Sequence, residues 1–229
     1  MQDESTTIIS IQVGMPQRLR DESGIDQIDP VWTSGIYKES ATGPVWITTT
    51  GPVGDGQADL NNHGGTEQAV LLYAASHYPA WRSALDRPEL AYGGFGENLT
   101  VAGMTEDTVC IGDRIEVGEV LLEVSQPRKP CWKLARRNGV ADLAQQVQAN
   151  GRGGWYVRIL REGHVEAGQP FTLVDRPFPQ WTVTRTNDVM YLRDADRSVR
   201  AELAACRALS PRWRKVFDVP VQRRADSAA

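Results

Sequence analysis

Cysteine and histidine are scarce in this chain, whose 229 residues include three of each. Cys110, Cys131 and Cys206 are an odd number at wide spacing, which argues against a disulfide framework. There is no Cys-x-x-Cys pair and the histidines are scattered, so neither gives the spacing of a zinc site. Flavin and nicotinamide motifs and an iron–sulfur cysteine set are also missing. Any oxidoreductase chemistry therefore requires electrons from a separate protein.

Long hydrophobic runs are missing as well, since none approaches the ~18 apolar residues of a membrane span. The first five residues are polar and acidic, which argues against a secretory signal. A hydrophobic content of 41% and a charged content of 24% are ordinary for a globular protein with a buried core. The length suits one good-sized domain, or one domain with an appendage. We expect a cytoplasmic protein in a reducing compartment, without membrane contact.

The net charge of −4 hides an uneven distribution. Acidic side chains are in excess over residues 1–175, and basic ones over residues 176–229. A basic segment could contact nucleic acid or an acidic partner. Its arginines, however, alternate with acids at helical spacing, as in residues 193–197. A solvated helical face is therefore favoured over a nucleic-acid surface.

Short alternating segments predict a mainly β fold. The turn over residues 117–120 fits a tight hairpin, and glycines separate many of the segments. This pattern is typical of an antiparallel barrel or sandwich with helical insertions. Strands are predicted over 7–14, 35–39, 45–50, 97–101, 109–111, 114–117, 120–125, 155–161 and 169–174.

Helical patterns are fewer. Residues 67–84 have a helical apolar period, with a kink expected at Pro79 and with His77 on the core-facing stripe. The prolyl stretch 176–179 marks a domain boundary. We predict a barrel domain over 1–176, with its core at about 30–175, and a small helical domain and tail over 177–229. Helices are predicted over 141–149, 186–194, 198–208 and 211–217.

Residues 125–137 hold one cysteine among five basic side chains and no acidic one. A thiol acts as nucleophile or metal ligand as the thiolate, and nearby cations favour that form. Pro127 and Pro130 bring the chain to Cys131 in an extended conformation. Residues 132–137 then predict a short helix, whose N-terminus favours an anion. A buried structural cysteine beside a solvated basic helix is the alternative.

A second candidate site ends the glycine-rich loop over residues 51–65. Gly64 and Gly65 allow close approach of the backbone, and Thr66 suits the N-cap of the predicted helix. First-turn amides and the His63 imidazole could therefore cradle a phosphate or oxyanion. Ordinary helix capping beside an exposed histidine is the alternative.

The glycine turn at residues 92–99 lacks the spacing of a dinucleotide or phosphate-loop motif. Its Glu97 and Asn98 either fix a ligand or tie down the loop. Cys110 and Cys206 lie in apolar segments and are expected to be core thiols.

Together these motifs resemble a MOSC domain (molybdenum cofactor sulfurase C-terminal domain), and in particular the stand-alone bacterial YiiM type. The resemblance covers residues from about 30 to 220 and implies a mostly antiparallel β-barrel with peripheral helices, followed by three short helices. Its most specific part is the Ser-Gln-Pro-Arg…Pro-Cys string. The matching motifs are Asn62–Gly65, Phe95–Leu99, Ile111–Asp113 and Glu123–Leu134.

The resemblance also implies site residues. Cys131 matches the family cysteine and would ligate the molybdenum of the molybdenum cofactor (molybdopterin). His63 would be a second catalytic residue, at an anion or proton-donor site. Further cofactor contacts would come from Arg128, Lys129, Lys133, Gly64, Gly65, Thr66, Glu97 and Asn98.

The implied activity is reduction of N-hydroxylated base analogues and hydroxylamines with electrons from a separate reductase. A non-catalytic carrier of molybdenum cofactor or persulfide sulfur is the alternative. Sulfurases of the wider family add a pyridoxal-phosphate module of several hundred residues, which this chain cannot supply. Pyridoxal phosphate binding is therefore a family-level association only.

The helical segment is expected to pack on itself, on the barrel or on a second subunit in a homodimer, because isolated helices of fewer than ~12 residues are marginal in water. We expect it to serve assembly or to dock the reductase, and to add nothing to the chemistry.

Overall fold

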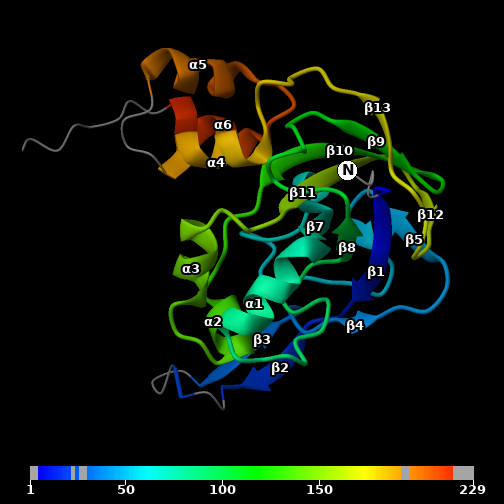
Figure 1. Ribbon diagram of the computed structural model, residues 1–229, viewed down its shortest axis with the longest axis vertical. Helices are drawn as coiled ribbons and strands as arrows, with labels where there is room; N and C mark the ends of the chain where they lie inside the picture. Colours follow the sequence, from blue (N-terminus) through cyan, green and yellow to red (C-terminus); the bar gives the residue numbers. More distant parts are fainter. Residues whose placement is uncertain (1–4, 22–23, 26–29, 192–195, 219–229) are drawn as a thin grey trace, which may run out of the picture.

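The computed structural model describes residues 5–21, 24–25, 30–191 and 196–218. An eight-stranded sheet dominates the fold and curls into a half-barrel (Figure 1). Its strands run in the order β13-β9-β10-β11-β7-β8-β1-β4. β7 and β8 pair in parallel, and the other neighbouring strands pair antiparallel. The strands are β1 (Thr7–Val13), β4 (Glu39–Ser40), β7 (Val70–Ala74), β8 (Leu99–Ala102), β9 (Arg114–Val117), β10 (Val120–Pro127), β11 (Trp155–Arg161) and β13 (Thr172–Asp175).

Two small sheets and two groups of helices surround this sheet. The small sheets are β12 (Gly163–Val165) with β5 (Val45–Thr48) and β6 (Gly51–Pro52), and β2 (Gln17–Arg20) with β3 (Val31–Ser34). Figure 1 shows α4, α5 and α6 gathered together, apart from α2 and α3. Within the described residues, no helix is long and apolar enough to cross a membrane. The helices are α1 (Tyr78–Ala84), α2 (Lys133–Asn138), α3 (Leu143–Ala149), α4 (Val183–Tyr191), α5 (Arg197–Ala205) and α6 (Pro211–Asp218).

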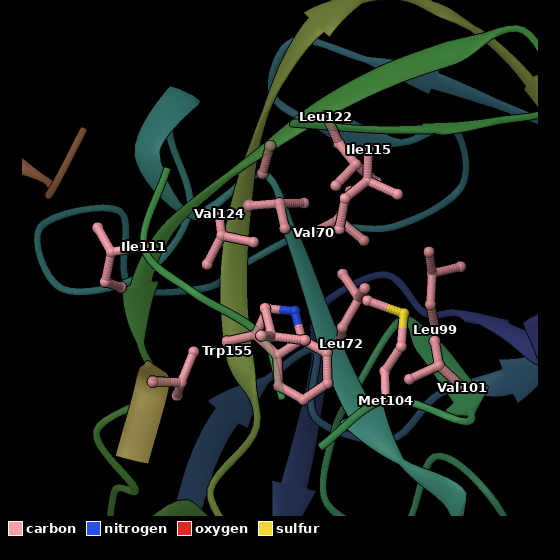
Figure 2. Packing of buried hydrophobic residues seen from close by; sticks show 14 of the residues in the cluster. Val70, Leu72, Leu99, Val101, Met104, Ile111, Ile115, Leu122, Val124 and Trp155 are labelled. Atoms are coloured by element: carbon pink, nitrogen blue, oxygen red, sulfur yellow. The ribbon is translucent and has the colours of Figure 1, made fainter. Parts of the chain in front are cut away.

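The main apolar core lies inside the curled sheet. Side chains from several strands point toward one another there, as Figure 2 shows for Val70, Leu72, Leu99, Val124 and Trp155. The same cluster continues without a break into the C-terminal helices. The helices therefore pack on each other and on the sheet, through Trp181, Val183, Val189, Leu203, Leu209, Trp213 and Phe217.

The predicted mainly β fold with peripheral helices and a small helical part is confirmed. The predicted strand over 109–111 is not a regular strand, because Cys110 forms an isolated bridge with Thr182. The predicted C-terminal helices correspond to α4, α5 and α6. Residues 192–194 at the end of the first of them, and the tail after residue 218, lie outside the described residues.

The helix predicted over residues 67–84 is wrong in its first half. Val70–Ala74 forms the central strand β7, in which every residue is buried. A continuous apolar run fits a buried strand and a buried helix equally well, because neither leaves a polar face. Pro79 lies in the first turn of α1, where its missing N–H has no helical partner to lose.

Candidate functional site

Cys131 lines a cavity at the end of β10, where the chain leaves the sheet. The cavity is lined by residues 34–36, 38, 55–58, 63–64, 68, 71, 96, 98, 128–129, 131, 133 and 156. We call this space the central cavity. Its volume of about 80 Å³ is smaller than the ~150 Å³ cavity that accommodates benzene. It can therefore hold the reacting end of a ligand, and the rest must lie in neighbouring clefts.

The local structure around Cys131 follows the prolines. Strand β10 ends at Pro127, and the Leu134 N–H donates to the Cys131 carbonyl at 3.1 Å as α2 begins. The predicted short helix is confirmed, with its first residue at Lys133. The Cys131 thiol is free and partly exposed, whereas Cys110 and Cys206 are free and buried. Burial raises the pKa of the Cys110 thiol, which fits its prediction as a core residue.

Three of the five nearby cations face the central cavity, namely Arg128, Lys129 and Lys133. The Arg128 guanidinium also donates to the Phe95 carbonyl at 2.9 Å, so it ties the glycine turn to the end of β10. Lys129 is exposed and Lys133 is buried. These side chains make the wall beside the thiol positive.

The other two cations stabilise aromatic packing. The Arg136 guanidinium lies 4.5 Å from the ring centroid of Trp132, and that of Arg137 lies 4.9 Å from the centroid of Tyr37. Arg137 also donates to the Ile36 carbonyl. Of the five basic side chains, three therefore line the cavity and two pack against aromatic rings beside it.

His63 lines the central cavity with Cys131, as predicted from their motifs. Burial lowers the pKa of His63 below 6.5, and the nearby Lys133, Arg128 and Arg212 act in the same direction. Asp59 opposes them, with an effect smaller than those of burial and Lys133. At neutral pH the imidazole is therefore uncharged, and it can accept a proton or a hydrogen bond. His77 lies elsewhere, hydrogen-bonded to Glu106 at 2.7 Å.

The predicted helix N-terminus at the glycine loop is wrong. Thr66–Gln68 is a single 3₁₀ turn preceded by Gly65, without a side-chain cap. Gly64 lines the central cavity, whereas Gly65 and Thr66 are exposed and lie outside its lining. Gly64 has φ +80°, and a Cβ there would lie 2.4 Å from Gln57 Oε1, so the close approach predicted for a glycine is present.

Glu97 and Asn98 serve the glycine turn first. Glu97 is fully buried and accepts hydrogen bonds from the Gly93 N–H at 2.7 Å, the Phe95 N–H at 3.1 Å and the hydroxyls of Thr100 and Tyr78. It lies outside the cavity lining, so the structure gives it the role of tying down the loop. Asn98 accepts from the Leu71 N–H at 3.1 Å but also lines the central cavity.

Sequence reasoning missed a buried ion pair in the cavity wall. Lys38 Nζ contacts Asp55 Oδ1, and the exposed fractions of their side chains are 5% and 1%. Burial lowers the pKa of Lys38, although Asp55 acts in the opposite direction. Asp55 also accepts from the Gly14 N–H at 2.9 Å. No local pattern marks either residue, because a predicted strand and a glycine loop separate them in sequence.

Tyr156 is a further missed residue of the cavity wall. It lies opposite Gln126 in the β10–β11 register. Burial raises the pKa of its phenol, while the nearby Arg128 guanidinium opposes this. The hydroxyl therefore stays protonated at neutral pH and can donate a hydrogen bond into the cavity.

A second cavity adjoins the first and is closed by the C-terminal helices. It shares His63, Gln68, Lys129, Cys131 and Tyr156 with the central cavity and has a volume of about 480 Å³. We call it the interdomain cavity. Its remaining walls include Gln126, Trp132, Met190, Tyr191, Arg212, Trp213 and Val216.

Arg212 of α6 fixes the helices to the glycine loop, because its guanidinium donates to Asn62 Oδ1 at 3.1 Å. The helical segment therefore contributes to the walls of the site. The sequence had led us to expect an appendage that serves only assembly or reductase docking. A third cleft, of about 790 Å³, has His63, Lys133, Trp32 and Trp132 among its lining residues.

The arrangement suits an anionic ligand with a thiophilic centre. A thiolate is a good ligand for soft metals, and the cations beside Cys131 attract negative groups. The uncharged imidazole, the phenol and the buried ion pair can each hold a proton near the thiol.

Comparison with known proteins places this site in a family. Residues 59–172 match the MOSC domain, and residues 181–218 match the YiiM-like 3-alpha helix domain. The chain therefore belongs to the MOSC family, and its C-terminal helices are of the YiiM-like kind. Uncharacterized protein YflK of Bacillus subtilis is 40% identical over 218 residues, which make up 95% of this chain and 95% of that protein.

Two further matches extend this result. A protein of Gibberella moniliformis named Reductase is 41% identical over 173 residues, or 74% of this chain. Those residues make up 31% of that protein, so the chain spans less than a third of its length. The crystal structure of YiiM from Geobacillus stearothermophilus matches with a TM-score of 0.77 and 32% identity, covering 93% of this chain and 97% of that one.

Proposed function

We propose that this protein binds the molybdenum cofactor and reduces N-hydroxylated compounds with electrons from a separate reductase. The observation that carries the proposal is the free Cys131 thiol in a cavity wall with Arg128, Lys129 and Lys133. Membership of the MOSC family supports the cofactor, and the fungal relative named Reductase supports redox chemistry.

The residues present fit such a cofactor chemically. Cys131 would supply a thiolate to the soft metal, and Lys129 and Lys133 would hold its anionic groups. When bound, the cofactor supplies the two-electron redox centre that the side chains lack. The small central cavity would hold the reacting end and exclude water from it.

Reductive cleavage of an N–O bond consumes two electrons and two protons, and it converts N–OH to N–H and releases water. The chain must therefore deliver protons to the central cavity. Lys38 is suited to this, because its lowered pKa makes the ammonium a better proton donor than an exposed lysine. His63 and the Tyr156 hydroxyl can pass a proton onward along the same wall.

The electrons have to come from outside the chain, since its sequence has no flavin, nicotinamide or iron–sulfur motif. We therefore propose a separate reductase as the electron donor.

The test is a reductase-coupled assay on cofactor-loaded protein, with metal analysis of the same samples. Cys131→Ser is expected to lose N-hydroxy reduction by at least ~100-fold and to lose bound molybdenum, because a serine hydroxyl gives no comparable anion at neutral pH. Cys206→Ser, which changes a buried thiol outside the lining of both cavities, should keep both. Full activity of Cys131→Ser with bound cofactor would contradict the proposed ligand. Bound molybdenum without turnover in the unmodified protein would indicate the carrier function instead.

A further inference from the structure

Arg158 joins three parts of the protein that are far apart in sequence. Its guanidinium forms ion pairs with Glu123 of β10 and with Glu67 in the 3₁₀ turn Thr66–Gln68. It also donates to the Ala208 carbonyl, between α5 and α6, at 2.8 Å. An arginine carries five N–H donors in a rigid fork, so one side chain can hold several acceptors in fixed positions. The sheet, the turn after the glycine loop and the C-terminal helices therefore meet at this side chain.

Ser125 fixes the backbone of the same turn. It is fully buried in β10, and its hydroxyl lies 2.6 Å from the Glu67 carbonyl and 3.0 Å from the Tyr156 carbonyl, either of which can accept its proton. Its own carbonyl accepts from the Ser210 N–H, just before α6, at 2.9 Å. The turn is thus held through its backbone as well as through the Glu67 side chain, at the place where α6 begins.

His63 lies between this turn and a second attachment of the loop. On its other side, the guanidinium of Arg212 in α6 binds Asn62 Oδ1 at 3.1 Å. Two glycines directly follow His63, both at positive φ, and glycine restricts the backbone little. The place of the imidazole therefore depends on how the two ends of the segment 62–67 are held, because the chain between them is not stiff.

We propose that Arg158 is a positioning residue, which keeps the His63 imidazole in the wall of the central cavity by holding Glu67. This rests on the proposed function, in which His63 passes a proton toward the substrate. Arg158 itself lies outside the lining of both cavities, so it acts through the loop. Because the same guanidinium binds the Ala208 carbonyl, the C-terminal helices belong to the arrangement that sets His63 in place.

Glu67→Ala is the variant that separates positioning from folding. The Glu67 side chain is 35% exposed, and Arg158 keeps its ion pair with Glu123 in this variant. No buried charge is left without a partner, so the melting temperature should fall by at most about 4 °C. Glu67→Gln keeps an oxygen that can accept from Arg158 and serves as the conservative variant. Arg114→Met is the matched control, because Arg114 also binds Glu123, at 2.9 Å, but its other ion-pair partner is Asp175 of β13.

The first experiment is an NMR titration of the His63 imidazole in the full chain, without cofactor or reductase. Burial and the nearby cations keep the pKa of His63 low. If Glu67→Ala lets the loop move outward, the pKa of His63 should rise toward 6.5. Loss of the negative charge alone would lower that pKa, so the sign of the change distinguishes movement from electrostatics. Glu67→Gln and Arg114→Met should show no rise.

Arg158→Met tests whether the arginine acts through Glu67. It should also raise the pKa of His63, and combining it with Glu67→Ala should add no further rise, because both changes break the same contact. An unchanged or lower pKa of His63 in Glu67→Ala, or a rise of the same size in Arg114→Met, would overturn the proposal.

The second experiment is the reductase-coupled assay on cofactor-loaded protein, with N-methylhydroxylamine as substrate. Glu67→Ala should lower kcat roughly 10- to 100-fold and leave KM within about threefold, since a misplaced proton-transfer group slows the reaction more than it weakens binding. Glu67→Gln should recover most of kcat. An unaltered kcat in Glu67→Ala would overturn the role in catalysis. If the NMR pattern is as expected but the unmodified protein does not reduce the substrate, the proposed reduction fails while the positioning of His63 stands.

Discussion

Replacing Glu97 tests whether this carboxylate binds the cofactor or supports the cavity from behind. It is fully buried and accepts hydrogen bonds from two loop N–H groups and two hydroxyls. The loop that it holds presents the Phe95 carbonyl, which in turn receives the Arg128 guanidinium at 2.9 Å. Glu97→Ala would therefore leave several buried donors unpaired and loosen one wall of the central cavity.

The size of the effect follows from those contacts. Hydrogen bonds to a charged group contribute about 1.5–3 kcal/mol each, but shared networks are not additive. Glu97→Ala leaves buried neutral donors unpaired at about 1–3 kcal/mol each, so a total loss of about 3–5 kcal/mol is expected once non-additivity is allowed for. Glu97→Gln keeps the side-chain volume and one acceptor, so a loss of about 1–3 kcal/mol is expected. Tyr78→Phe is the matched control. It deletes one donor to Glu97 and the acceptor of the Gly94 N–H, with an expected loss of about 1–2 kcal/mol.

The assay is urea unfolding of the cofactor-free protein at neutral pH, monitored by circular dichroism. Cofactor content is then measured under conditions where each variant is folded. If Glu97 supports the loop, Glu97→Ala loses the most stability, and Glu97→Gln and Tyr78→Phe lose less. Folded Glu97→Gln then keeps the cofactor. Wild-type stability of Glu97→Ala, or a fully stable Glu97→Gln that cannot bind cofactor, would refute the structural role.

Two other predictions concern pH and the C-terminal helices. The pKa of His63 is lowered below 6.5 in the folded protein, so the unfolded chain binds the proton more readily and stability should fall as pH drops through about 6.5. Urea unfolding between about pH 8 and pH 5 should show a smaller loss of stability for His63→Gln than for the unmodified protein. An equal loss in the two proteins would contradict the lowered pKa of His63. Truncation after Pro179 should lower the melting temperature, because it removes the helices that cover one end of the core. The central cavity is lined by residues up to 156 only, so a truncated protein that remains folded should still bind cofactor. A truncated protein that folds without binding cofactor would contradict this division.

Local chemistry made the Cys131 segment predictable. Pro127 and Pro130 set the backbone conformation directly, and the following residues favour a short helix without help from distant parts of the chain. His63 and Cys131 were expected to share a pocket because the glycine loop and the basic strand end both favour anions, and both residues line the central cavity. The roles assigned to them remain predictions.

Tertiary context decided the features that the sequence did not reveal. Val70–Ala74 became a strand because it pairs with β8 and β11, while Val70 and Leu72 pack into the main core and Tyr73 packs into a second apolar cluster. No apolar period within the segment can express this. The Lys38–Asp55 pair depends on a chain reversal between a strand and a loop. The cavity wall supplied by α4 and α6 depends on how the C-terminal helices pack against the sheet. The hydrophobic pattern within each segment does not determine that packing.

The apolar core that continues from the sheet into α4, α5 and α6 affects how the protein is made. The strands leave the ribosome before these helices, so the nascent sheet exposes the apolar surface that Trp181, Leu203 and Phe217 later cover. Such surfaces promote aggregation in partly synthesised chains. The yield of soluble protein should therefore depend on slow synthesis or chaperone supply, and substitutions that delay docking of these helices should reduce yield before they affect the finished fold.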